Sequence, residues 1–118
     1  MLKFARAVGW AWSGIRYTIK TQRNMKIHLA VAVLVVIICW YLSLTPEELA
    51  VMSLTIFLVL AAEMFNTAIE TVVDLATLER HPLARAAKDV GAGAVLLTAI
   101  NALVVAYLLI WPHLSGLF

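Results

Sequence analysis

The chain has 118 residues, of which 64% are hydrophobic and 14% are charged, and its mean hydropathy is +0.95. A soluble domain is roughly 45–50% apolar, so this composition argues against a soluble protein and predicts one small all-α membrane domain over residues 1–118. The net charge of +2 gives no reason to expect a nucleic-acid partner. With a single cysteine, Cys39, the chain cannot form an intramolecular disulfide.

Residues 2–22 are predicted to form an amphipathic helix that lies in the headgroup plane of a membrane. Its apolar and basic faces follow helical spacing, with Phe4, Val8, Trp12, Ile15 and Ile19 on one and Arg6, Arg16 and Lys20 on the other. A plain membrane anchor has the same pattern and stays an alternative. Trp10 projects near the basic face, where it either anchors the helix or packs on a cytoplasmic ligand. Because residues 1–23 lack a compact apolar core, we expect no cleavable signal peptide.

Three apolar runs follow, at about 27–44, 49–75 and 90–114. A helix needs about 20 residues to cross the hydrocarbon core of a membrane, so each run is predicted to span it. Thr45-Pro46-Glu47-Glu48 separates the first two runs and is typical of a helix start. His81-Pro82 marks the second break.

The basic residues predict the orientation of these spans. Six of the nine Lys and Arg residues precede Ile27, and the other three are Arg80, Arg85 and Lys88. Basic residues near span ends favour the cytoplasmic side. We therefore expect a multi-pass protein with its N-terminus and the 80–88 region in the cytoplasm and its C-terminus outside.

A polar stripe interrupts the second apolar run. Its members are spaced at 0, +3, +4, +7 and +11, so they share one helix face; they are Glu63, Asn66, Thr67, Glu70 and Asp74. Carboxylates are costly inside a bilayer and usually mark a functional site. The competing interpretation is that such residues only pair helices with one another, which we expect for Asn101 in the third span.

The depth of the two glutamates suits a reaction between a lipid and a cytoplasmic reagent. Glu63 lies roughly 21 Å into its span, near the inner edge of a ~30 Å core, and Glu70 is about 10 Å closer to the cytoplasm. The deeper carboxylate can accept a proton from a lipid hydroxyl, and the shallower one can hold Mg²⁺ on a nucleotide. Asn66 can position phosphate oxygens, and Lys88 can neutralise the transferred group.

Other nucleotide and metal motifs are absent. The chain has no GxxxxGK[ST] phosphate loop, and Gly91-Ala92-Gly93-Ala94 is more typical of close helix packing. His28 and His113 lie near span ends and form no metal-binding pattern with other residues.

The motif E-x-x-N-[ST]-A-I-E-x-x-V-D at 63–74, followed by His81 and the A-K-D of 87–89, resembles the signature of the small bacterial integral-membrane lipid kinases. These are the diacylglycerol kinases and undecaprenol kinases, and the likeness covers essentially the whole chain. The resemblance implies a homotrimer in the bacterial plasma membrane with sites shared between subunits, and ATP with Mg²⁺ as the reagents. It implies Glu63 as catalytic base, Glu70 as metal ligand, and as nucleotide contacts Trp10, Asn66, Glu79, Arg80, His81, Lys88 and Asp89.

Two details of residues 22–29 distinguish this chain within that family. The family usually has a second metal-binding glutamate where this chain has Gln22, whose amide oxygen is a weaker, uncharged ligand. The pattern R-N-x-x-I-H at 23–28 resembles the undecaprenol kinase branch. Undecaprenol is therefore the favoured substrate, with diacylglycerol as the alternative. Both lipids present a primary hydroxyl, so Glu63 does not discriminate between them.

Two hypotheses of a different class compete with a kinase: an oligomeric ion or proton conduit, and a purely structural adaptor. A pore should carry polar groups across its outer half as well, yet residues 50–62 offer only Ser53 and Thr55. An adaptor leaves the acidic stripe without a purpose.

Overall fold

The computed structural model describes all 118 residues, and every regular element in it is a helix. The four helices are α1 (Leu2–Thr21), α2 (Arg23–Tyr41), α3 (Pro46–Ala76) and α4 (Pro82–Ser115). The last three are long and apolar enough to cross a membrane, which confirms the prediction of an all-α chain with three candidate spans. α4 begins at Pro82, ahead of the apolar run at 90–114, so its first turns are polar.

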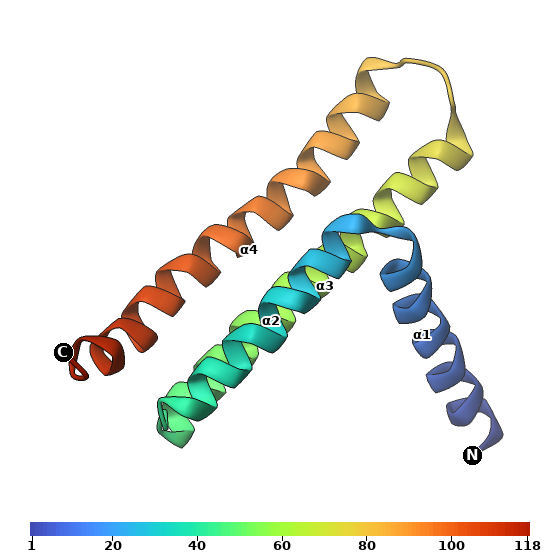
Figure 1. Cartoon of the computed structure of the whole chain (residues 1–118). Coiled ribbons are helices and arrows are strands. Elements are labelled where there is room, and N and C mark those ends of the chain that lie inside the picture. Colours follow the sequence, from blue (N-terminus) through green and yellow to red (C-terminus); the bar gives the residue numbers. More distant parts are fainter.

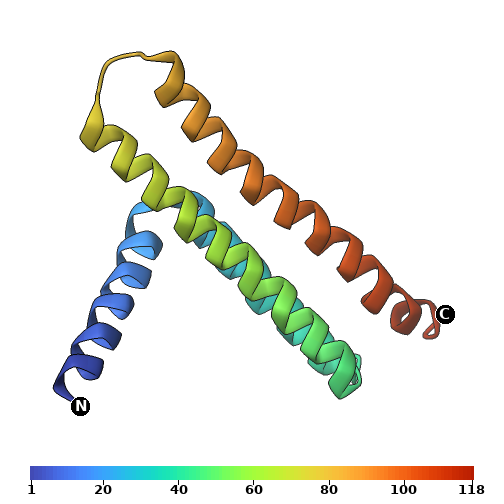
Figure 2. The ribbon, with the colours of Figure 1, turned by 180° about the vertical axis from the view of Figure 1, so that it is seen from behind.

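Different helices pack against the two halves of α3. α3 and α4 form a long antiparallel pair joined by the short connection 77–81 (Figure 1). α2 lies along the half of α3 that is remote from this connection, and α1 leaves the other helices at an angle (Figures 1 and 2). The last turns of α3 and the first turns of α4 therefore project past the start of α2. Two regions along α3 can therefore be distinguished: one beside the start of α2, and one next to the α3–α4 connection.

The interior of a single chain is small and unusually polar. Only 12 of the 118 residues are buried, and large apolar side chains face outward along all three spans. Lipid tails are as apolar as leucine, so such faces are stable in a membrane. Five of the buried residues are polar: Thr18, Thr55, Glu63, Asn66 and Thr67. Polar groups at the helix contacts are the feature that separates this bundle from an inert membrane anchor.

A capping box holds the end of the bundle opposite the 77–81 connection. The Thr45 hydroxyl accepts a hydrogen bond from the Glu48 N–H, and Glu48 Oε1 accepts one from the Thr45 N–H, both at 3.2 Å. This reciprocal pair starts α3 at Pro46, as the sequence pattern predicted. Glu48 Oε2 lies 2.9 Å from Nε2 of His113, so the same side chain also ties α3 to the end of α4.

The 77–81 connection is held by short side-chain bonds at its two ends. The Thr77 hydroxyl accepts a hydrogen bond from the Glu79 N–H at 3.1 Å. His81 caps α4, because its Nδ1 accepts from the Leu83 N–H at 3.1 Å. Pro82 follows in the first turn, where its missing N–H costs nothing. These two bonds shape the turn from the end of α3 into the start of α4.

Candidate active site

Glu63 is the most deeply buried carboxylic acid of the chain. It sits on α3 with 1% of its surface exposed, and its Oε2 has no hydrogen-bond partner. The nearest basic group is Nε2 of His28 on α2, at 3.7 Å. A buried carboxylate without hydrogen bonds is costly, so this residue is kept at the expense of stability. Such a group is suited to bind or deprotonate something that arrives from outside.

Asn66 and Thr67 lie next to Glu63 on the same helix face and are also buried. The Thr67 hydroxyl donates to the Glu63 backbone carbonyl at 2.9 Å, so it is occupied within the helix. Asn66 Oδ1 has no partner and faces Gly91 of α4. Gly91 lacks a side chain, and this allows α4 to approach closely enough to cover the amide. The Asn66 acceptor is therefore buried against α4 without a hydrogen bond.

Glu70 lies two helical turns beyond Glu63 and is half-buried. No three His, Cys, Asp or Glu side chains come together in one chain to form a metal site. Mg²⁺ commonly uses one or two carboxylates and takes its other ligands from phosphates and water. A single carboxylate at this position fits an ion that arrives with a nucleotide, and it does not fit a metal cage made by the protein alone.

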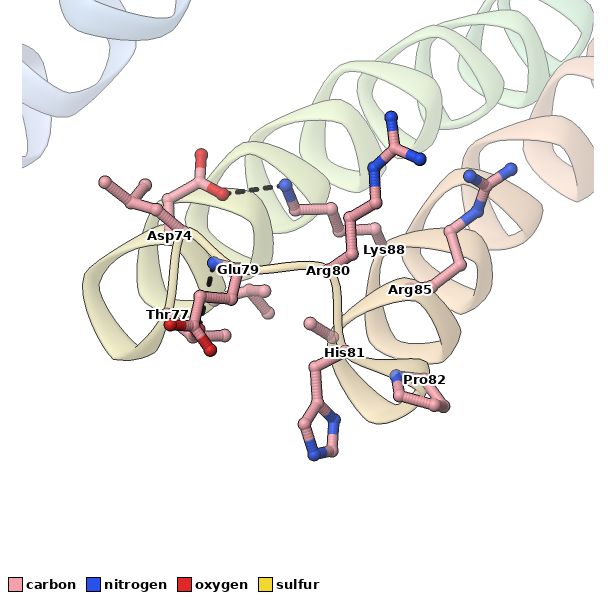
Figure 3. Close-up of a pocket in the computed structure, with 11 residues that line it drawn as sticks. Asp74, Thr77, Glu79, Arg80, His81, Pro82, Arg85 and Lys88 are labelled. Atoms are coloured by element: carbon pink, nitrogen blue, oxygen red, sulfur yellow. Dashed lines mark hydrogen bonds and ion pairs between the residues drawn. The ribbon is translucent and has the colours of Figure 1, made fainter.

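A polar cavity of about 690 Å³ lies between the end of α3 and the start of α4. Its charged lining residues are Asp74, Glu79, Arg80, Arg85 and Lys88, with His81 and Thr77 beside them. Lys88 Nζ contacts Asp74 Oδ1 at 2.7 Å and so bridges α4 and α3. In Figure 3 the Arg80 and Arg85 side chains extend to the same side as this pair, and the His81 ring points the other way. The excess of cations suits a phosphate-bearing ligand.

Glu63, Asn66 and Glu70 lie earlier on α3 than this cavity, and three more predicted site residues also lie outside it in a single chain. Asp89 pairs instead with Arg85 one turn away, with Nε to Oδ1 and Oδ2 distances of 3.0 and 3.2 Å. Trp10 on α1 is 72% exposed, and neither it nor Gln22 lines the cavity. Figure 1 shows why: α1 diverges from the α3–α4 pair.

Two further polar residues lie in the candidate spans. Asn101 is exposed and its side chain makes no hydrogen bond within the chain. The expected bond to another helix is therefore not made inside a single chain and stays a prediction. His28 was given no role in the site, although it is the ionisable side chain that pairs with Glu63. Only its place in the R-N-x-x-I-H pattern hinted at a function.

A buried carboxylate without a hydrogen bond lies in a bundle of three candidate membrane spans, and a cavity with several cationic lining residues lies beyond it. This arrangement fits the class of integral-membrane enzymes that act on a lipid and a phosphate donor. Comparison with known proteins agrees. The sequence profile described as "Prokaryotic diacylglycerol kinase" matches residues 9–110. The chain therefore belongs to the prokaryotic diacylglycerol kinase family and is an ATP-using lipid kinase, which replaces the conduit and adaptor hypotheses.

Individual relatives carry two different names. The chain is 38% identical over 112 residues to the undecaprenol kinase of Bacillus subtilis, covering 95% of this chain and 91% of that protein. It is 35% identical over 112 residues to the diacylglycerol kinase of Escherichia coli, covering 94% and 91%. It is 45% identical over 109 residues to the diacylglycerol kinase of Synechocystis, covering 92% of this chain but 62% of that protein. The chain thus spans less than two thirds of the Synechocystis relative.

We predict that Gly91→Ala lowers the catalytic rate by on the order of tenfold or more, because small displacements of positioning groups cost that much. The added methyl group would meet Oδ1 and Cγ of Asn66 and Cδ1 of Ile69. Phosphate transfer to lipid in mixed micelles is the measurement. Gly93→Ala is the matched control, since a methyl group there meets nothing and the gain in helix propensity is the same. Equal rates for both variants would show that the position of Asn66 does not matter.

Proposed function

We propose that the protein transfers the γ-phosphate of MgATP to the primary hydroxyl of a membrane lipid, and that undecaprenol is the preferred lipid. The buried, unpartnered carboxylate of Glu63 carries the proposal of catalysis. The R-N-x-x-I-H pattern at 23–28 and the Bacillus subtilis relative named undecaprenol kinase support the substrate. Diacylglycerol is the second candidate, because the relatives from Synechocystis and Escherichia coli are named for it.

Glu63 is the proposed catalytic base. In this reaction the lipid hydroxyl loses its proton to Glu63 as its oxygen attacks the γ-phosphorus, and the bond between that phosphorus and ADP breaks. Phosphoryl transfer depends mainly on positioning and charge stabilisation. The unsatisfied Asn66 Oδ1 marks this amide as free for a bound molecule, and we assign it to orient the reacting groups.

The cation-lined cavity is the proposed nucleotide site. Lys88 is held by Asp74 at 2.7 Å, and we propose that phosphate oxygens compete with Asp74 for this ammonium when ATP binds. Glu79, Arg80, His81 and Asp89 surround the rest of the nucleotide. Mg²⁺ would neutralise phosphate charge, held by Glu70 and, with a weaker neutral oxygen, by Gln22.

We propose a homotrimer in which active sites are shared. A single chain buries few residues and leaves Trp10 and Gln22 away from the cavity. It also leaves the amide of Asn101 exposed in the middle of a candidate span. Polar side chains within a bilayer usually face another helix, so contact with a second subunit explains Asn101. The α1 helix of a neighbouring subunit can then bring Trp10 and Gln22 to the site.

We propose that residues 1–118 act as a single domain in the bacterial plasma membrane. Its N-terminus and the 77–81 connection face the cytoplasm, and its C-terminus faces outward, because basic residues cluster on the cytoplasmic side. α1 lies on the cytoplasmic membrane surface, consistent with its departure from the bundle in Figure 1. This orientation places the cavity where ATP is available.

We predict that Glu63→Gln lowers phosphate transfer by roughly 10²–10⁴-fold, the usual contribution of a general base. The amide keeps the shape of the side chain but cannot accept the proton. Glu47→Gln is the matched control, because Glu47 is exposed at the other end of α3 and should leave the rate unchanged. A folded Glu63→Gln protein with full activity would contradict the assignment of the base.

The lipid is identified by supplying undecaprenol and diacylglycerol side by side to purified protein in micelles with labelled MgATP. We expect the higher kcat/KM for undecaprenol, by about tenfold or more, equivalent to about 1.4 kcal/mol of discrimination. Preference for diacylglycerol would retain the mechanism and overturn the substrate assignment. No transfer to either lipid by folded protein would contradict the proposed function.

The dependence of the rate on Mg²⁺ concentration tests the metal ligands. We expect Glu70→Gln to raise the concentration needed for half-maximal activity by at least about tenfold, since even outer-shell partners of metals contribute about that much. Gln22→Glu should lower it, because a full negative charge replaces a neutral oxygen. If neither variant changes the Mg²⁺ dependence, these residues are not metal ligands.

A further inference from the structure

The contact between α2 and α3 brings an imidazole to the buried carboxylate. Nε2 of His28 lies 3.7 Å from Oε2 of Glu63, the oxygen that has no hydrogen-bond partner. This separation is longer than a hydrogen bond, but a small rotation of either side chain, or one water molecule, closes it. Hydrogen bonds of catalytic groups are often long in the absence of substrate. His28 is therefore within reach of the proposed base.

The two side chains differ in their access to the surroundings. The Glu63 side chain is 2% exposed and the His28 side chain is 23% exposed. His28 also lies about 8 Å from the start of α2, at 1.5 Å per residue, which places it near the membrane–water boundary. The Glu63 carboxyl is almost completely enclosed and its Oε2 is fully buried, whereas the more exposed imidazole of His28 offers a proton a route to the surroundings.

No other ionisable group competes for this role. His28 forms no second ion pair, and Glu63 forms none except with His28. On the side of α4, His28 borders a narrow apolar groove of about 120 Å³ lined by Ala102, Leu103 and Ala106. The next carboxylate on the same face of α3 is Glu70, two turns away. Lys26 on α2 is exposed and forms no ion pair.

We propose that His28 is the proton-relay and positioning residue of the phosphotransfer site. It orients Glu63 and takes from it the proton that Glu63 removed from the lipid hydroxyl. In this step the O–H bond of Glu63 breaks, an N–H bond forms at Nε2 of His28, and the imidazolium then gives the proton to water. Glu63 is thereby restored as a carboxylate for the next lipid. The proposal rests on the proposed function of Glu63 as the base.

The test compares His28→Ala and His28→Gln with the wild type in micelles, with kcat and KM measured separately. We expect kcat to fall about 10–100-fold, within the range of one proton-transfer contribution, and KM for lipid and ATP to change little. Added imidazole should restore the rate of His28→Ala in a concentration-dependent manner, since the deleted ring and the adjacent groove leave room for it. His113→Gln is the matched control, because that histidine contacts Glu48 at the opposite end of the bundle.

Each alternative outcome overturns the proposal in a distinct way. Full kcat in His28→Gln means that the proton leaves by another route. A slow His28→Ala that imidazole does not restore means that His28 is only structural. If His28→Ala fails to fold, kcat and KM are measured on His28→Gln, which keeps a hydrogen-bonding side chain of similar length. Glu63→Gln is assayed in parallel. An active Glu63→Gln would contradict the proposed function itself. An inactive Glu63→Gln together with fully active His28 variants would contradict only the relay.

Discussion

The structure depends on the placement of one carboxylate. Burying Glu63 without a hydrogen bond to its Oε2 opposes folding, and the surrounding helices make that burial possible. α4 approaches because Gly91 has no side chain to displace Asn66, and α2 brings His28 to the opposite side. Asn66 and Thr67 are buried beside Glu63 on the same face of α3, but neither side chain donates a hydrogen bond to its carboxyl. An apolar residue at position 63 would make a more stable bundle and leave no base for the lipid.

The offset between α2 and the α3–α4 pair separates the candidate site residues into two zones. Glu63 lies beside the start of α2, next to His28. Asp74 lies eleven positions further along α3, roughly 16 Å away at 1.5 Å per residue, and Lys88 contacts it from α4. In the proposed mechanism, a nucleotide laid along α3 would join the two zones with its reactive end toward Glu63. The lipid would then react without leaving the membrane, and ATP would react without entering it.

A single chain leaves some polar and aromatic side chains of this bundle without neighbours. The apolar faces need only lipid to cover them, but the exposed amide of Asn101 and the distant Trp10 call for another helix. The proposed trimer would supply that helix by repeating the same chain. At the end opposite the 77–81 connection, α3 and α4 are already joined within one chain, because Glu48 both caps α3 and contacts His113 at 2.9 Å. The proposed assembly would therefore complete the bundle at the end where the candidate site lies.

Much of this protein follows from sequence patterns. The apolar runs predicted the spans, Thr45-Pro46-Glu47-Glu48 predicted the start of α3, and the spacing of Glu63, Asn66 and Glu70 predicted one polar face, because helix periodicity and capping are local properties. Contacts between helices are not local, so only the tertiary structure decided that His28 meets Glu63, that Gly91 meets Asn66 and that Lys88 meets Asp74. It also left Asn101 exposed in a single chain, since the rotation of α4 about its axis is set by packing against its neighbours. Sequence determined which groups are present and on which face, and packing alone determined which of them meet.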